Sequence, residues 1–157
     1  MISSRLHVMS RVNATRYRGR DPYIVISIRS PRESVPKLRE DPFRVARMNL
    51  AFDDWAPEWA AVYGTDDAVC MTEAHASRIA QFVARHLQTA KHCVVHCRHG
   101  ISRSAGVAAG ILEALGDASA SAFEVPPYEP NPHVRKLVRD AFRAQITAKG
   151  KTKMVYE

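Results

Sequence analysis

The stretch HCRHGISRS, residues 96–104, lies between two segments of different character. Before it, residues 93–95 (CVV) form an apolar, largely β-branched run that suits a buried strand. After it, residues 104–115 are rich in Ala, Val, Ile and Leu and predict a helix. The nine residues are therefore expected to form a loop between the end of a strand and the N-terminus of a helix.

A loop of this kind suits an anion. Backbone N–H groups at a helix N-terminus converge on a bound anion, and the helix dipole adds partial positive charge. Arg103 adds a guanidinium, which donates two parallel hydrogen bonds to two phosphate oxygens as no lysine can. The same electropositive surroundings favour a thiolate at Cys97, and a thiolate can attack phosphorus. The sequence therefore predicts a phosphate site with a nucleophile beneath it.

The pattern HCxxGxSRS resembles the active-site loop of the cysteine-dependent protein tyrosine phosphatases, in the dual-specificity form. The resemblance implies a phosphomonoester hydrolase that forms a phosphocysteine on Cys97 and needs no metal or cofactor. It implies that Ser104 donates to the Cys97 sulfur and helps it depart, and that His96 orients the loop from behind. It also implies that the phosphate oxygens are held by the loop residues Arg98, His99, Gly100, Ile101, Ser102 and Arg103.

The resemblance further requires an aspartate that protonates the leaving oxygen, on a mobile loop upstream of the cysteine. Residues 44–52 read as a strand, and Asp53 and Asp54 follow it directly. This arrangement is similar to the strand-end acidic pair of small phosphatases, in which the second residue is the acid. Asp54 is therefore the predicted general acid, with Asp53 as the alternate.

Two later aspartates stay open as alternatives. Asp54 lies 43 residues before Cys97, which is longer than the family's usual spacing, whereas Asp66 and Asp67 lie 31 and 30 residues before it. Asp66 and Asp67 follow a polar turn with no strand before it, and acidic residues in such turns are usually solvated. The stretch 56–71 is then expected to be a lengthened lid.

The rest of the chain predicts an α/β fold. We expect strands at 6–9, 23–28, 44–52 and 90–95, and helices at 72–88, 104–115 and from 132 onward. Thr72 and Asn131 are the expected caps of the first and last of these helices. Such alternation favours a central, mainly parallel sheet of about four to five strands flanked by helices. The site would then lie at the C-terminal end of a strand.

Length and composition suit one domain over residues 1–157, with 149–157 as a frayed tail. No apolar run approaches the roughly 20 residues that cross a bilayer, so membrane insertion is not expected. The N-terminus lacks the layout of a secretory signal, and three cysteines, one a predicted thiolate, suit a reducing compartment. A cytoplasmic location is expected.

The other cysteines, Cys93 and Cys70, raise two questions. His92 and Cys93 repeat the His-Cys pair four residues before the loop, but one extended strand cannot wrap four ligands around zinc. Packing explains Cys93 better than metal binding. Capture of an oxidised Cys97 by Cys93 or Cys70 stays open, since it depends on their proximity.

The net charge of +7 and the isoelectric point near 9.7 favour anionic partners. Phosphoproteins, phosphoinositides, inositol polyphosphates and RNA 5′-phosphates all suit a basic rim. The loop lacks the lysines that mark lipid-directed relatives, which favours a phosphoprotein. A module that binds phosphate or nucleic acid without turnover is the alternative of a different class, and nucleic acid is less favoured because most aromatic residues lie in expected core elements. The oligomeric state is not predicted.

Overall fold

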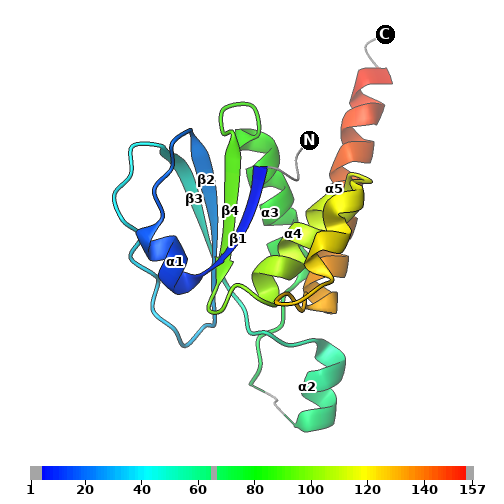
Figure 1. The fold of residues 1–157 in the computed structure, drawn as a ribbon. Helices are drawn as coiled ribbons and strands as arrows, with labels where there is room; N and C mark the ends of the chain where they lie inside the picture. Colours follow the sequence, from blue (N-terminus) through cyan, green and yellow to red (C-terminus); the bar gives the residue numbers. More distant parts are fainter. Residues whose placement is uncertain (1–4, 65–66, 155–157) are drawn as a thin grey trace.

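A computed structural model describes residues 5–64 and 67–154 of the chain. Its centre is a sheet of four parallel strands in the order β1-β4-β2-β3 (Figure 1). The strands are β1 (Leu6–Ser10), β2 (Tyr23–Arg29), β3 (Arg44–Ala51) and β4 (His92–Cys97). The predicted α/β fold with a parallel sheet of four to five strands is confirmed.

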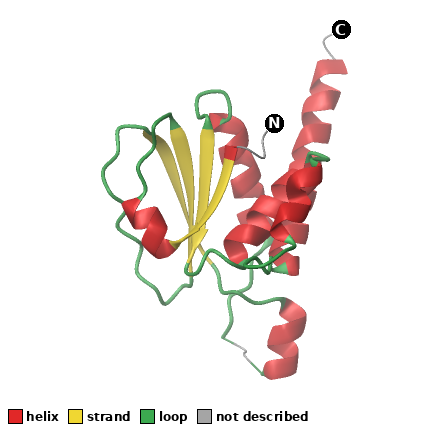
Figure 2. Cartoon of the chain, in the orientation of Figure 1, coloured by secondary structure: helices red, strands yellow, loops and turns green. Residues whose placement is uncertain are grey.

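Three helices cover one face of the sheet (Figure 2): α3 (Glu73–His86), α4 (Arg103–Ala114) and α5 (Pro132–Met154). Their apolar sides and the strand side chains Ile24, Ile26, Val95 and Leu50 form the main core. Ile79 and Val83 of α3 are buried in this core. The long apolar runs of the sequence are therefore explained by a sheet buried between two layers.

The other face of the sheet is covered by α1 (Arg11–Arg16) and by the loops at 17–22 and 30–43 (Figure 1). A smaller core lies there, made by Tyr23, Val25 and Val94 with Met9, Tyr17 and Leu38 packed against it. The helix α1 was not expected from the sequence. It starts after Ser10, whose side chain accepts a hydrogen bond from the Asn13 N–H at 3.2 Å.

Both predicted caps are present. The Thr72 side chain accepts from the His75 N–H, and the His75 ring accepts from the Thr72 N–H, which makes a capping box. The Asn131 Oδ1 accepts from the N–H groups of His133 and Val134, at 3.0 and 3.1 Å. Each helix therefore begins at the residue that the sequence indicated.

The last two helices approach each other closely at Gly110 of α4. A Cβ atom on Gly110 would lie 2.6 Å from the Arg135 carbonyl oxygen, so no larger residue fits without a shift. Beside this contact, Glu113 accepts hydrogen bonds from Arg135 and Arg139 of α5 at 2.8 and 3.2 Å. A Cβ on Gly106, in the first turn of α4, would lie 3.0 Å from the Asn131 carbonyl oxygen, so the two helices also begin next to each other.

Two short helices were also not expected, namely α2 (Pro57–Tyr63) and the 3-10 helix η2 (Ala118–Phe123). The helix α2 lies beyond the C-terminal end of the strands, apart from the two layers (Figure 1). Helix α5 continues to Met154, so it extends over most of the tail expected to fray from residue 149, where three of the six residues up to 154 are lysines, which favour a helix. Residues 155–157 of that tail lie outside the described residues. None of the helices at 5–64 and 67–154 is long and apolar enough to cross a bilayer.

Candidate active site

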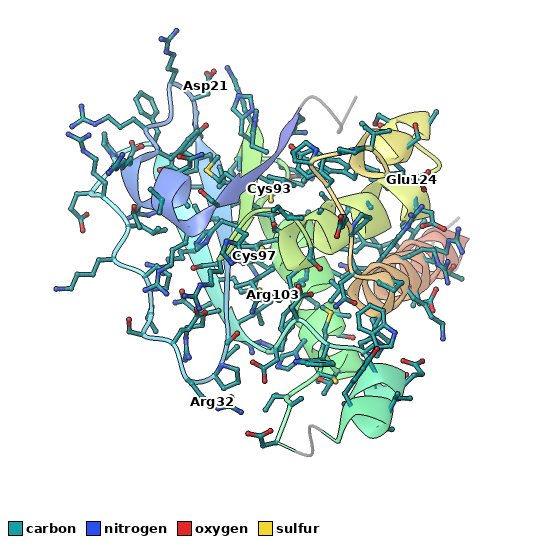
Figure 3. The ribbon with its side chains drawn as sticks, turned by 60° about the horizontal axis from the view of Figure 1, so that its bottom comes forward. Asp21, Arg32, Cys93, Cys97, Arg103 and Glu124 are labelled. Carbon is teal, nitrogen blue, oxygen red and sulfur yellow. The ribbon has the colours of Figure 1, made fainter. Side chains whose placement is uncertain are left out.

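The predicted strand, loop and helix around residues 96–104 are confirmed. Strand β4 ends at Cys97 and α4 begins at Arg103, with the loop 98–102 between them. Figure 3 looks toward this end of the sheet, where Cys97 and Arg103 lie near each other. Gly100 has φ +70°, and a Cβ there would lie 2.5 Å from the Met9 carbonyl carbon. Only glycine allows the loop to turn this close to β1.

Cys97 is 3% exposed, at the end of the central strand. Its Sγ lies 3.1 Å from the Ser104 Oγ, whose hydroxyl can donate to a thiolate. Burial alone raises the pKa of this thiol, but hydrogen bonds from the Ser104 side chain and from the Ser104 and Gly100 backbones, together with the Arg103 charge, lower it below its ordinary value. The surroundings of Cys97 therefore favour the nucleophilic form.

Arg103 is 5% exposed, and the ends of two strands hold its guanidinium. Its Nη1 donates to the Ser30 Oγ, just after β2, at 3.0 Å and to the Phe52 carbonyl, just after β3, at 2.9 Å. Its buried Nε has no hydrogen-bonding partner among the described residues. A buried, charged donor without a partner is costly unless an anion satisfies it, so Arg103 is suited to bind one.

A pocket of about 490 Å³ opens over the cysteine and the arginine. Four of the predicted phosphate-binding residues line it, and Arg98 and Gly100 do not. The Arg98 side chain instead forms an ion pair with Glu33 at 3.0 Å. The lining residues are Asp54, Trp59, Cys97, His99, Ile101, Ser102, Arg103, Glu129, Pro130, Asn131 and Pro132.

Asp54 lies in this pocket, with its carboxylate held between two elements. Its Oδ1 accepts from the Ser102 hydroxyl at 2.7 Å and from the Asn131 Nδ2 at 2.9 Å. Ser102 belongs to the loop 98–102, and Asn131 precedes α5. The structure therefore places the predicted acid in the same cavity as Cys97 and Arg103.

The three alternative acids have different surroundings. The Asp53 Oδ2 accepts from the Val69 N–H at 2.9 Å, so this carboxylate ties the two ends of the lid together and does not line the pocket. Asp67 forms an ion pair with Arg32 at 2.7 Å, and its side chain is 80% exposed. Asp66 lies outside the described residues. Of the described candidates, Asp54 is the carboxylate that lines the pocket.

The segment between Asp54 and α3 contains helix α2, which accounts for the long spacing to the cysteine. Trp59 of α2 lines the pocket and is 42% exposed. The rings of Trp55 and Tyr63, at the two ends of the helix, lie 6.1 Å apart and connect it to the strand end. The sequence indicated a lengthened lid here, but not that a tryptophan of the lid forms a pocket wall.

His96 is fully buried behind the loop. Burial, together with the charges of Arg47 and Arg11, lowers its pKa to about 4 and outweighs the opposing effect of the Cys97 backbone. Neither ring nitrogen reaches hydrogen-bonding geometry with another described group. His96 is therefore neutral and buried beneath the loop, and its role in orienting the loop stays a prediction.

Cys93 cannot capture an oxidised Cys97, which corrects one of the two redox alternatives. The two residues are four positions apart on the same strand, about 13 Å between Cα atoms, whereas a disulfide needs roughly 4.4–6.8 Å. Burial also raises the pKa of Cys93 to about 12. Burial and the carboxylates of Asp53 and Glu58 raise the pKa of Cys70, and Cys70 does not line the pocket.

No family model matches this sequence, and no curated protein matches it. Solved structures do match. Human DUSP28 is 18% identical over 91% of this chain and 94% of its own, with a TM-score of 0.55. A mouse protein described as a dual specificity phosphatase, complexed with zinc tungstate, is 17% identical over 88% of this chain and 76% of its own, with a TM-score of 0.51. PTPMT1 in complex with PI(5)P is 18% identical over 82% of this chain and 81% of its own, with a TM-score of 0.45.

The chain therefore has the fold of these dual-specificity phosphatase structures. The resemblance drawn from residues 96–104 is confirmed at the level of the fold.

Proposed function

We propose that this protein is a cysteine-dependent phosphatase that hydrolyses phosphomonoesters on protein side chains through a phosphocysteine on Cys97. The observation that carries the proposal is the meeting of three groups in one cavity. Cys97, whose pKa is lowered, lines the same pocket as the buried Arg103 guanidinium, which has an unused donor, and the Asp54 carboxylate. These are the nucleophile, the phosphate ligand and the proton donor that such a reaction needs.

In the first step, the Cys97 thiolate forms a bond to phosphorus while the bond from phosphorus to the substrate oxygen breaks. Asp54, protonated, gives its proton to that oxygen, and Arg103 and the loop N–H groups stabilise the charge on the other phosphate oxygens. In the second step, water attacks the phosphorus and Asp54 takes up a proton from it. The S–P bond then breaks, and Ser104, at 3.1 Å, stabilises the departing thiolate.

The walls of the pocket support a phosphorylated side chain as substrate. Trp59, Ile101 and Pro130 offer apolar surface above the phosphate site. One cation, Arg103, lines the pocket with the acidic residues Asp54 and Glu129, so the cavity suits a single phosphate better than a headgroup with several. A thiolate nucleophile works only where it stays reduced, so a cytoplasmic location goes with this proposal.

The test is hydrolysis of p-nitrophenyl phosphate in the presence of EDTA. We expect vanadate-sensitive turnover that Cys97→Ser abolishes and that Asp54→Asn lowers by about 10²- to 10⁴-fold. Asp67→Asn is the matched control, since it removes an exposed carboxylate of the same lid region and should change turnover less than about twofold.

Two results would contradict the proposal. Phosphate or RNA binding without any turnover would indicate a binding module. A greater loss in Asp53→Asn, Asp66→Asn or Asp67→Asn than in Asp54→Asn would reject the acid assignment.

A further inference from the structure

The net charge of the chain is concentrated in its first 50 residues. They contain 11 Lys and Arg and four Asp and Glu, a net charge of +7, whereas residues 51–157 contain 12 of each and are neutral. The first 50 residues form β1, α1, β2 and nearly all of β3, with the loops between them. The positive field of the molecule therefore comes from the first third of its sequence.

The fold gathers this charge on one side of the sheet. Helix α1 and the loops 17–22 and 30–43 cover the face opposite α3, α4 and α5 (Figure 1). Two hydrogen bonds join these segments, from the Arg39 N–H to the Thr15 carbonyl at 3.3 Å and from the Gly19 N–H to the Asp41 carboxylate at 2.8 Å. Their side chains thus share one surface, and in Figure 3 many nitrogen-tipped side chains project from the blue and cyan segments.

Most cations on this surface have no carboxylate partner. Among the described residues, six of them are at least partly exposed and form no ion pair with an acidic side chain. We call this group the basic face: Arg11, Arg16, Arg18, Arg20, Lys37 and Arg39.

The basic face begins at the rim of the proposed active site. The Arg11 N–H donates to the carbonyl of Arg98, the residue that follows Cys97, at 3.2 Å. Along α1, Arg16 lies about 8 Å beyond Arg11, and the chain to Arg20 adds at most about 14 Å. An extended peptide spans roughly 3.4 Å per residue, so these arginines lie about three to seven residues from a phosphorylated side chain in the pocket.

Carboxylates are the anions that this rim already binds. Glu33 pairs with Arg98 at 3.0 Å, and Asp67 pairs with Arg32 at 2.7 Å. A single-stranded nucleic acid would need stacking platforms, but among the described residues up to 50 the exposed large aromatic is Phe43. A lipid surface would need a continuous stripe of large apolar side chains, whereas the exposed ones here are mainly separate valines such as Val12 and Val35.

We propose that the basic face binds an acidic stretch of the substrate polypeptide, about three to seven residues from its phosphorylated side chain. This inference rests on the proposed function, because it names what that same active site acts on. The acidic stretch adds ion pairs outside the pocket, so it strengthens capture of the substrate and leaves the chemical step unchanged. Such exposed pairs weaken as salt screens them.

The experiment compares two phosphotyrosine peptides of equal length. One has four glutamates at positions three to six from the phosphotyrosine, and the other has glutamines there. At low salt we expect kcat/KM to be about tenfold higher for the acidic peptide, and this difference should arise from a lower KM. The ratio of the two kcat/KM values should be smaller in 0.5 M salt. Substitution of Arg16, Arg18 and Arg20 by Gln should bring the ratio near one, while turnover of p-nitrophenyl phosphate stays unchanged.

The matched control replaces three exposed cations on the helical side, Arg78, Arg85 and Arg143, by Gln. This control variant changes the net charge by the same amount. It should keep the preference for the acidic peptide if the location of the cations on the basic face matters, and should lose that preference if only the net charge matters. Equal kcat/KM for the two peptides in an active wild type would overturn the inference and leave the proposed function intact. So would binding of RNA or of anionic vesicles that the Arg16, Arg18 and Arg20 substitutions remove, without a peptide preference.

Binding to the Cys97→Ser variant separates the two proposals. If the wild type hydrolyses no phosphomonoester, the proposed function fails, and fluorescence anisotropy of the labelled peptides then tests the basic face alone. Tighter binding of the acidic peptide that depends on Arg16, Arg18 and Arg20 would support the face. Equal binding of the two peptides would reject it.

Discussion

Asn131 connects the start of α5 to the proposed general acid, and its replacement should separate stability from catalysis. Its side chain is nearly fully buried at 1% exposure. The Oδ1 caps α5, as it accepts from the N–H groups of His133 and Val134, and this leaves the Nδ2 to donate to Asp54 at 2.9 Å. One amide thus holds a helix with one atom and a carboxylate with the other.

Asn131→Ala removes both bonds, and Asn131→Ser keeps a capping oxygen but loses the bond to Asp54. A lost cap costs about 1 kcal/mol, and a lost buried hydrogen bond to a charged group about 1.5–3 kcal/mol. We expect the free energy of unfolding to fall by about 3 kcal/mol in Asn131→Ala and about 2 kcal/mol in Asn131→Ser. In a chain of 157 residues these losses correspond to Tm decreases of about 6–12 °C and 4–8 °C.

The two variants should lose activity equally, although their stabilities differ. Both free one side of the Asp54 carboxylate, so we expect kcat to fall about tenfold in each, measured well below Tm. The effect should be larger for phosphotyrosine than for p-nitrophenyl phosphate, whose leaving group needs less protonation.

A double-mutant cycle with Asp54→Asn tests whether Asn131 acts through Asp54. In the Asp54→Asn background, Asn131→Ser should lower kcat no further, because the group that it positions is already absent. Additive losses of kcat, or an Asn131→Ser variant with the kcat of the wild type, would refute the positioning role.

Three further predictions concern the same loop. Carboxymethylation of Cys97 by iodoacetate should show a midpoint pH below that of a free thiol, and Ser104→Ala should raise the midpoint, because the strongest bond that lowers the pKa is lost; a midpoint near 8.5 would contradict this. His96 has a pKa of about 4 in the folded chain and about 6.5 in the unfolded chain. Between these two pH values the unfolded chain binds the proton more readily, so the free energy of unfolding decreases as the pH is lowered. Urea unfolding should show a loss of about 2 kcal/mol from pH 7 to pH 5 that is smaller in His96→Asn, and equal losses would reject the assignment. Arg103→Lys should lower kcat/KM for p-nitrophenyl phosphate at least about 10²-fold, because lysine cannot hold Phe52 and the phosphate together; unchanged kinetics would remove Arg103 from the site.

The strand, loop and helix at residues 92–114 could be predicted because their signals are local. An apolar run, a glycine with positive φ and a run of small apolar residues each determine the backbone nearby. The order of strands in the sheet has no such signal, since β1 pairs with β4 across more than 80 residues. Helix α2 did have one, because Pro57 and Gly64 stand at its start and end. Because the stretch 56–71 was interpreted as a lid, the helix within it was not predicted.

The site was partly predictable for the same reason. Asp54 could be proposed from its place after a strand, which determines where the carboxylate emerges. The usual spacing to the cysteine favoured Asp66 and Asp67. That spacing is misleading here, because the lid with α2 lengthens the chain between Asp54 and Cys97 without moving Asp54 out of the pocket. Asn131 was predicted as a cap, but its second bond joins residues 77 positions apart and needs the fold.

The bonds of Asp54 explain how this chain accommodates a long lid without displacing its acid. The carboxylate is held by Ser102 of the loop 98–102 and by Asn131 at the start of α5, neither of which belongs to the lid. Asp53 closes the base of the lid through its bond to the Val69 N–H. Residues between these points can therefore lengthen or form α2 while the proposed proton donor, Asp54, stays in place. Trp59, which lies on that free segment, is then the part of the pocket wall that can vary with the substrate.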